Sequence, residues 1–525
     1  MTAIINNRGA IASEDDVINH LGDIEEYVKM RKRFNKTIKL KFGYINKVVV
    51  VKRELFRSDK GDFFTIIMPR FLPFKKPYSR MFHTVEPPKF RKSRPLSTEP
   101  KQIFTPREFQ QVAADYILDN FLTNSAAAAG NAGVILELEA GCGKTFVAAL
   151  VFARLRVRTL YVVPNQYLLK QAMEDFRKCF GDSIKIGEYS SKKKKDGDIV
   201  FAIINSLENF KCTDPKSADV SKSVFELSIW DEVHEYATKK RSAYFNNVFS
   251  KYILGLTAEA NSRADKLDFI VHNHCGPVVI ANEIPGFSVP MTERFTSNIR
   301  IISYKGPEEH CQNIVGATGM MSACEMSKQL CRDPYRTTMI LDELVRLCGK
   351  GHNVFLWCDL RSTVSMFKTL LSNLKLYNED KTDDEVSFGC LMGSLTDAEI
   401  KSAQKSRVII ATYQYAYRGV SLPNFDAMIF VSPRRAKIYQ TLKRIYRMGG
   451  DPTVTRQVVD IVDVKTKLKA QLSTRMLEYK KDIFGAEIIK EKISYDDIVP
   501  KKEVIDFISE FTAESETDSD QNIIE

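Results

Sequence analysis

Several features that would place a protein in an oxidising compartment or a membrane are missing from this sequence. Its ten cysteines form no C-x-x-C pair and have no histidine at metal-ligand spacing, so a zinc site is not expected. Residues 1–16 lack an apolar signal core, and no window reaches the about 18 apolar residues of a membrane span. We therefore expect reduced thiols and a soluble intracellular protein of the cytoplasm or nucleus, with no membrane contact.

Positive charge is absent from one end of the chain and concentrated near the other. No Lys or Arg follows Lys502, and residues 503–525 are acidic, although the whole chain has a formal net charge of +11. Residues 69–100 are rich in Pro and basic residues, with aromatic side chains between the cations. This pattern suits stacking and phosphate contacts to a nucleic-acid strand, and the acidic tail suits a protein partner. Solvated surface, or a linker that wraps over the next domain, explains the same residues equally well.

A chain of 525 residues is too long to fold around a single hydrophobic core, and its length suggests about three domains. Residues 1–100 predict a smaller N-terminal α+β domain that ends in the basic, Pro-rich linker. Residues 101–280 and 336–480 each alternate apolar strands with helical stretches, which predicts two α/β domains with parallel sheets. We interpret residues 281–335 as a bridge or insertion and residues 481–525 as a C-terminal extension with the acidic tail.

A phosphate-binding loop follows the apolar run 134–136. It consists of Gly141, Cys142, Gly143, Lys144 and Thr145. Backbone N–H groups and a helix N-terminus then face one position that an anion can occupy. There Lys144 can bind the β- and γ-phosphates of ATP, and the Thr145 hydroxyl can bind Mg²⁺. The first Gly of the full pattern is replaced by Leu138. A corner that merely contains Gly-Lys-Thr is the alternative interpretation.

Two further positions fit the same nucleotide. Asp231 and Glu232 follow an apolar strand, so Asp231 can hold Mg²⁺ while Glu232 orients and deprotonates the water that attacks the γ-phosphate. An acidic pair at a strand end is also a common structural feature. Upstream, Gln110 lies near the start of an amphipathic helix, and its amide can offer a donor and an acceptor to an adenine edge.

The order of these segments resembles the superfamily 2 helicases of the DExH type, especially those of large DNA viruses (the poxvirus-type transcript-release helicase), phages and DNA repair. The resembling segments are the phosphate loop (motif I), 164–171 (Ia), 231–234 (II), 254–258 (III), 413–423 (V) and 440–447 (VI). Glu259 and Ala260 stand where Thr-Pro is usual, and Ser421 stands where Asp is usual.

The resemblance implies two tandem RecA-like domains with ATP between them. In the segment that resembles motif VI, Gln440, Arg444 and Arg447 occupy the family's places. Gln440 would then contact the nucleotide, and the two guanidinium groups would stabilise charge on the transferring phosphoryl group. Helical Arg pairs more often face solvent, so these roles depend on the resemblance.

The resulting prediction is an ATP-dependent helicase or translocase, a monomer that binds DNA or RNA largely without regard to sequence. In a virus it would act in transcription or repair, in the virus factory or the virion. Two alternatives stay open: an ATPase that does not separate strands, and a binding subunit with a degenerate site. A ring-forming ATPase that borrows its arginine from a neighbouring subunit is disfavoured, because the chain supplies its own Arg444 and Arg447. ATP and Mg²⁺ are the expected cofactors.

Overall fold

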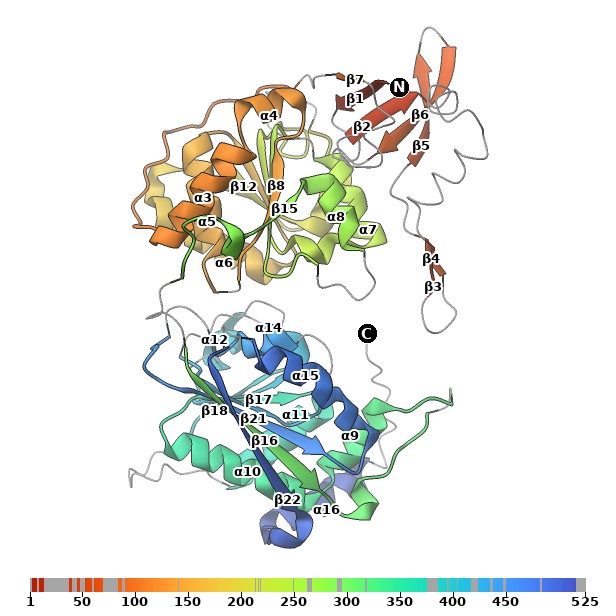
Figure 1. Ribbon diagram of the computed structural model, residues 1–525, viewed down its shortest axis with the longest axis vertical. Helices are drawn as coiled ribbons and strands as arrows, with labels where there is room; N and C mark the ends of the chain where they lie inside the picture. The colour runs from red at the N-terminus through yellow and green to blue at the C-terminus, as the bar shows by residue number, and fades with distance from the viewer. Residues whose placement is uncertain are drawn as a thin grey trace. The chain divides into compact units, whose positions relative to one another are not determined.

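The computed structural model describes short strands within residues 2–86 and then most of residues 90–515 (Figure 1). Before residue 90 it describes only 2–6, 9–13, 37–39, 45–47, 52–58, 61–68 and 84–86. After residue 90 it leaves out 140, 213, 216, 218, 249, 262–266, 290–294, 317–318, 375–385, 394, 396, 404, 417–423, 435–437, 447–449 and 482–483. The chain divides into two compact units, Met1–Ser288 and Val289–Glu525.

The described N-terminal strands form two antiparallel-rich sheets. The larger has the order β5 (Lys52–Ser58), β6 (Gly61–Met68), β2 (Gly9–Ser13), β1 (Thr2–Asn6) and β7 (Thr84–Glu86). The smaller pairs β3 (Thr37–Lys39) with β4 (Ile45–Lys47). A helix expected over residues 15–34 lies outside the described residues.

The first unit is built on an eight-stranded sheet in which every pairing is parallel except that of β10 with β11. Its order is β11 (Lys194–Lys195), β10 (Ile186–Tyr189), β12 (Ile199–Ile203), β9 (Thr159–Val163), β13 (Leu227–Trp230), β14 (Tyr252–Thr257), β8 (Gly133–Glu137) and β15 (Val278–Ile280). The central strands are apolar and buried because both faces of the sheet are covered.

Helices cover the two faces of this sheet (Figure 1). One face packs against α3 (Glu108–Asn120), α5 (Lys144–Leu155) and α6 (Gln166–Phe180), and the other against α8 (Asp268–Cys275). α6 begins where it does because the Asn165 side chain accepts a hydrogen bond from Leu168 N at 3.0 Å. Shorter helices are α4 (Asn124–Ala129) and α7 (Lys239–Ser242).

The second unit contains a seven-stranded, all-parallel sheet. Its order is β18 (Phe388–Leu391), β19 (Val408–Thr412), β17 (Val354–Cys358), β20 (Ala427–Phe430), β21 (Arg456–Asp463), β16 (Ser297–Lys305) and β22 (Ala486–Ser494). β16 lies inside the range 281–335 that we interpreted as a bridge, and β22 lies inside the predicted extension 481–525.

The helices of the second unit are α9 (Ala323–Cys331), α10 (Pro334–Gly349), α11 (Arg361–Leu374), α12 (Asp397–Ala403), α13 (Tyr413–Ala416), α14 (Ile438–Leu442), α15 (Leu472–Tyr479) and α16 (Lys502–Ser515). Buried side chains of α10, α11 and α16 share one core with the sheet. Arg336 of α10 pairs with Asp463 at the end of β21, through Nε–Oδ1 and Nη2–Oδ2 distances of 2.7 and 3.1 Å. The expected pair of parallel-sheet α/β domains is thus confirmed.

Residues 90–101, called the strap below, run along the edge of the first sheet at which the strands begin. Ser93 donates from its backbone N and its Oγ to Glu226 Oε1, at 3.0 and 2.9 Å, just before β13. Ser97 N donates to Asp198 Oδ1 at 2.7 Å, just before β12. These contacts fit the interpretation of the basic segment as a linker that wraps over the next domain. Most of residues 69–89 lie outside the described part.

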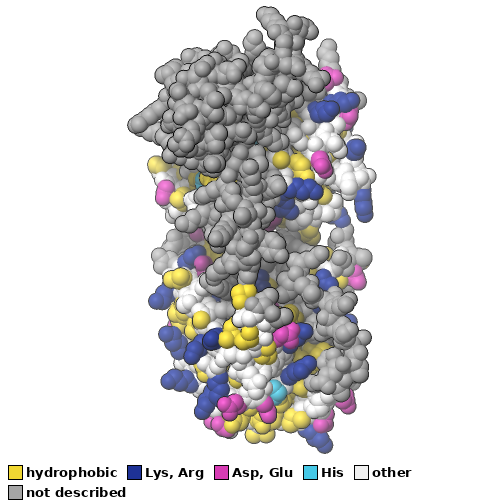
Figure 2. Space-filling model, turned by 90° about the vertical axis from the view of Figure 1, so that its right-hand side faces the viewer, with side chains coloured by type: hydrophobic (Ala, Val, Ile, Leu, Met, Phe, Trp, Pro, Cys, Tyr) yellow, Lys and Arg dark blue, Asp and Glu magenta, His cyan; other side chains and the backbone are white. Residues whose placement is uncertain are grey.

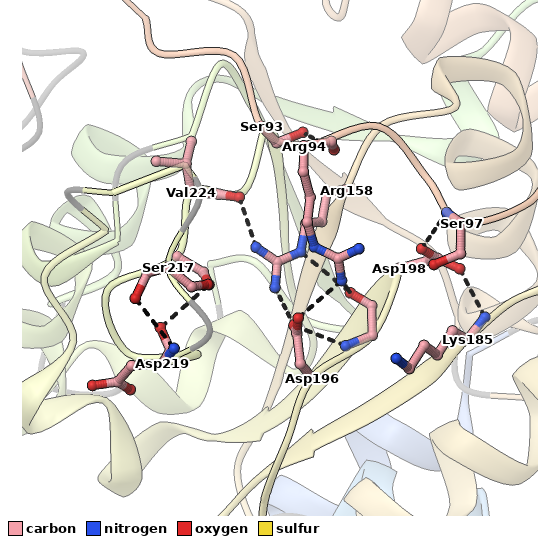
Figure 3. A network of polar contacts seen from close by, with 12 residues as sticks. Ser93, Arg94, Ser97, Arg158, Lys185, Asp196, Asp198, Ser217, Asp219 and Val224 are labelled. Carbon is pink, nitrogen blue, oxygen red and sulfur yellow. Dashed lines mark hydrogen bonds and ion pairs between the residues drawn. The ribbon is translucent and has the colours of Figure 1, made fainter.

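A buried arginine holds the centre of this edge (Figure 3). Arg158, which directly precedes β9, is 1% exposed and pairs with Asp196. It also donates to the carbonyl oxygens of Gly197 and Val224 at 3.2 and 3.3 Å. From the strap, Arg94 Nη2 reaches the other Asp196 oxygen at 2.9 Å. Burial lowers the pKa of Arg158, against the opposing effect of Asp196.

Within the described residues, every helix is too short or too polar to span a bilayer.

Candidate functional site

The phosphate loop joins the end of β8 to the start of α5. Gly141 and Gly143 have φ angles of +92° and +82°, a left-handed conformation that favours glycine. A Cβ atom on Gly143 would lie 2.4 Å from Gln110 Nε2. Two glycines at these positions therefore allow the chain to turn tightly, so that the first turn of α5 carries Lys144 and Thr145.

Gln110 supports this turn from α3. The side chain is 3% exposed, and its Nε2 donates to the carbonyl oxygen of Cys142 at 3.0 Å. Its Oε1 accepts from the backbone N of Arg107 at 3.1 Å. Both ends of the amide are thus engaged with the protein itself. A contact between Gln110 and an adenine edge stays a prediction, whereas the contact with the phosphate loop is direct.

The acidic pair converges on the phosphate loop, because β13 and β8 both end at this edge of the sheet. Lys144 Nζ lies 3.1 Å from Glu232 Oε1. Burial, the largest influence, lowers the pKa of Lys144, but Glu232 and Asp231 outweigh it, so the pKa lies above its usual value. Glu232 has a φ of +47°, a conformation that costs free energy in a non-glycine residue and is often found at functional sites.

Asp231 is the more buried of the two acids, at 7% exposure. Burial, followed by repulsion from Glu232, raises the pKa of Asp231 to about 7. The Tyr161 hydroxyl donates to Asp231 Oδ2 at 3.3 Å and also interacts with the Thr145 side chain. One phenol therefore bridges the two residues that were predicted as Mg²⁺ ligands.

This donor set fits Mg²⁺. A carboxylate and a hydroxyl are hard oxygen ligands, and Mg²⁺ bound with a nucleotide takes few protein ligands and completes its shell with phosphate oxygens and water. Within the described residues, no group of three His, Cys, Asp or Glu side chains could hold a metal ion by itself. Asp231 and Thr145 thus suit an ion that arrives with the nucleotide.

Two contacts join the acidic pair and the phosphate loop to the end of β14. His234 Nδ1 lies 2.9 Å from Thr257 Oγ1 and 3.5 Å from Glu232 Oε2. On the other side, the backbone N of Ala260 donates to Glu137 Oε2 at 2.9 Å, directly before the phosphate loop. Since proline has no N–H, the Ala that replaces the family's usual Pro is what allows this bond.

The second unit carries the remaining predicted site residues. Gln440 lies in α14, and Arg444 follows this helix with 9% of its surface exposed. Between them Lys443, where Gly is usual, lies over the rings of Tyr439 and Phe484, with distances of 5.5 and 5.8 Å to the ring centroids. Arg447 and Ser421 lie outside the described residues. The roles of Gln440, Arg444 and Arg447 stay predictions.

Sequence reasoning missed Tyr161 and Glu137. Tyr161 falls within a run of five buried residues, Thr159–Val163, so its pattern indicated only a core strand. Glu137 ends an apolar strand, and its partner is a backbone N–H group, which no side-chain pattern reveals.

Comparison with known proteins agrees with this geometry. The family model described as "Type III restriction enzyme, res subunit" matches residues 103–261. A candidate ATP-dependent RNA helicase of African swine fever virus is 26% identical over 481 residues, covering 87% of each chain. A candidate ATP-dependent RNA helicase of Acanthamoeba polyphaga mimivirus is 25% identical over 391 residues, covering 73% of this chain and 69% of its own.

A solved structure shares the fold. Mss116p bound to single-stranded RNA and AMP-PNP has a TM-score of 0.50 and 15% identity, and the match covers 77% of each chain. Two tandem RecA-like parallel sheets are the fold that this chain shares with that structure, and the first sheet carries the phosphate loop and the acidic pair. In sequence, this chain resembles candidate ATP-dependent helicases of large DNA viruses, which supports an ATP-dependent helicase of superfamily 2.

Proposed function

We propose that this protein hydrolyses ATP at the phosphate loop and at Asp231 and Glu232, and uses the hydrolysis to move along RNA. The observation that carries the proposal is the ion pair between Lys144 and Glu232 at 3.1 Å. It brings the cation proposed to bind phosphate and the proposed general base together at one edge of the sheet. RNA as the substrate is supported by the relatives, which are named as candidate RNA helicases.

In the proposed mechanism, Lys144 exchanges one anionic partner for another. Without nucleotide, Lys144 pairs with Glu232. An arriving γ-phosphate competes for the same ammonium group, and the Glu232 carboxylate becomes available to orient and deprotonate a water molecule. Mg²⁺ held by Asp231 and Thr145 would neutralise charge on the phosphates. Under this proposal, Lys144 holds the Glu232 carboxylate until the γ-phosphate is in place, so Glu232 activates water only in the nucleotide-bound site.

The test is to measure ATPase stimulation by RNA, single-stranded DNA and duplex DNA, in the parent protein and in Glu232→Gln. We expect RNA to stimulate most. Glu232→Gln should lower kcat at least 100-fold and leave ATP binding as tight as in the parent or tighter, because general base catalysis is lost and so is the carboxylate that competes with the γ-phosphate for Lys144. If the variant hydrolyses ATP as the parent does, the site is not catalytic. Preferential stimulation by DNA would overturn the RNA assignment.

A protein that moves along RNA without separating strands has the same site. A strand-displacement assay beside the ATPase assay distinguishes the two: RNA-stimulated hydrolysis without displacement identifies a translocase or remodelling ATPase.

A further inference from the structure

A buried arginine of the second unit contacts the turn that carries Arg444. On the face of this unit drawn in Figure 2, Lys and Arg side chains project into solvent. Arg456, the first residue of β21, is instead 1% exposed. Within the part of the chain that the structure describes, no carboxylate forms an ion pair with it. A buried guanidinium group without a carboxylate is less favourable for folding than an apolar side chain, which indicates a role beyond packing.

The guanidinium group of Arg456 is held by three contacts. Its Nε donates to the carbonyl oxygen of Ile445 at 2.7 Å, and its Nη1 donates to the carbonyl oxygen of Val454 at 2.7 Å. Its central carbon lies 4.1 Å from the centroid of the Phe295 ring. Burial lowers the pKa of Arg456, against the opposing effect of Asp426. The planar fork of donors thus joins the turn after α14 to the residues just before β21.

The bond to Ile445 completes the turn that follows α14. The backbone N–H groups of Arg444 and Ile445 donate to the carbonyl oxygens of Thr441 and Leu442, both at 3.1 Å, so turns of hydrogen bonds continue beyond the helix. The last carbonyl groups of a helical segment have no donor within the segment itself. Arg456 supplies a donor to one of these groups, on the residue that directly follows Arg444.

Two neighbouring contacts restrict the same segment. Tyr446 is 3% exposed, and its ring centroid lies 6.2 Å from that of Phe295 and 4.7 Å from that of Phe484. Before α14, the carbonyl oxygen of Arg434 accepts a hydrogen bond from Nη1 of the buried Arg475 at 2.8 Å. The two ends of the segment 434–446 are therefore both attached to buried side chains of the second unit.

We propose that Arg456 is a positioning residue for Arg444: by binding the Ile445 carbonyl, it fixes the backbone from which the Arg444 side chain extends. The inference rests on the proposed function, because the position of Arg444 matters only if this side chain takes part in phosphoryl transfer. A role in folding alone is the alternative. Positioning is favoured because the bonded carbonyl belongs to the residue next to Arg444, and a displacement of about 1 Å near reacting atoms can lower kcat about 100-fold.

The test is a double-mutant cycle in the full-length protein, with single-turnover ATPase kinetics at saturating ATP and RNA. Arg456→Lys keeps the charge, but an ammonium group cannot reproduce the fork that binds both carbonyl groups. We expect kcat to fall about 10- to 100-fold while the Kd for ATP stays within about threefold. Because Arg456 acts through Arg444, the double variant Arg444→Lys/Arg456→Lys should have a kcat within about twofold of that of Arg444→Lys.

Arg336→Lys is the matched control. Arg336 is also 1% exposed in the second unit, but its guanidinium group binds Asp463 and not the segment 434–446. We expect this variant to be less stable in urea denaturation and to change kcat less than about twofold. If melting shows that Arg456→Lys is unfolded, Phe295→Leu replaces it in the cycle. This substitution removes the ring beneath the Arg456 guanidinium group, keeps an apolar side chain, and should lower kcat in the same non-additive way.

Each other outcome overturns the positioning role. An unchanged kcat in Arg456→Lys, or losses that multiply in the double variant, would show that Arg456 does not act through Arg444 and would leave the proposed hydrolysis intact. An equal loss of kcat in Arg336→Lys would assign the effect to folding. Normal turnover of Arg444→Lys would leave Arg456 nothing to position. A parent protein that hydrolyses no ATP would overturn both this inference and the proposed function.

Discussion

At the scale of single residues, the N–H of Ala260 links the segment after β14 to the strand that leads into the phosphate loop. We expect Ala260→Pro to remove the donor and leave the partly buried Glu137 carboxylate without this bond, which destabilises the protein by about 1–3 kcal/mol. Urea denaturation measures the change. Ala260→Ser keeps the N–H and should stay within about 0.5 kcal/mol of the parent. Equal stability of the Pro and Ser variants would show that the bond contributes nothing.

Gly143 is the second residue at which we expect a single added carbon atom to have a measurable effect, here on ATP binding. Gly143→Ala places a Cβ 2.4 Å from Gln110 Nε2 and forces a left-handed φ that costs about 1–2 kcal/mol. We expect ATP binding to weaken at least tenfold, as measured by titration calorimetry. The double variant Gln110→Ala/Gly143→Ala removes the clash but not the backbone strain, so it should recover part of the loss. Full recovery would show that the backbone conformation is unimportant.

At the scale of elements, the strap and the strands it crosses depend on the buried Arg158. We expect Asp196→Ala to destabilise the first unit by about 2–3 kcal/mol, because it leaves a guanidinium group of 1% exposure without its carboxylate. The Asp196 side chain is itself 27% exposed, so the loss is smaller than for an ion pair in which both partners are fully buried. Thermal or urea denaturation measures the effect. The exposed Asp219→Ala, as control, should cost under about 1 kcal/mol; a similar loss in both variants would contradict the prediction.

The elements also show how far the sequence could predict this structure. Buried runs such as Thr159–Val163 made the parallel strands predictable, because strands covered on both faces are continuously apolar. β22 was not recognised, since it is an exposed edge strand that carries charges such as Glu487 and Lys490. Glycine spacing and strand ends located Lys144 and Glu232. Tyr161 was not found, and the strap was expected only as one of the interpretations of the basic segment, because their partners are distant in sequence and include carboxylates or backbone groups in no recognisable motif.

At the scale of the whole molecule, the two units carry different parts of the predicted machinery. Lys144, Asp231 and Glu232 belong to the first unit, whereas Arg444 belongs to the second. If Arg444 stabilises charge on the transferring phosphoryl group, Arg444→Lys should lower kcat by about 10²–10³ with little change in the Kd for ATP, because an ammonium group cannot reproduce the guanidinium fork. Single-turnover ATPase kinetics measure this. Arg332→Lys, an exposed arginine of the same unit, should have no effect, and normal turnover of Arg444→Lys would remove Arg444 from the site.

The strap has a consequence for the exchange of amide hydrogens with solvent. The amide hydrogens of Ser93 and Ser97 are donated to Glu226 and Asp198, so their exchange with deuterium requires the strap to leave the sheet edge. Those two amides therefore report when the amino-terminal segment separates from the ATPase unit. Asp198 and Glu226 directly precede β12 and β13, and the acidic pair directly follows the other end of β13. Slower exchange at residues 93 and 97 on nucleotide binding would therefore reveal communication along the length of these strands.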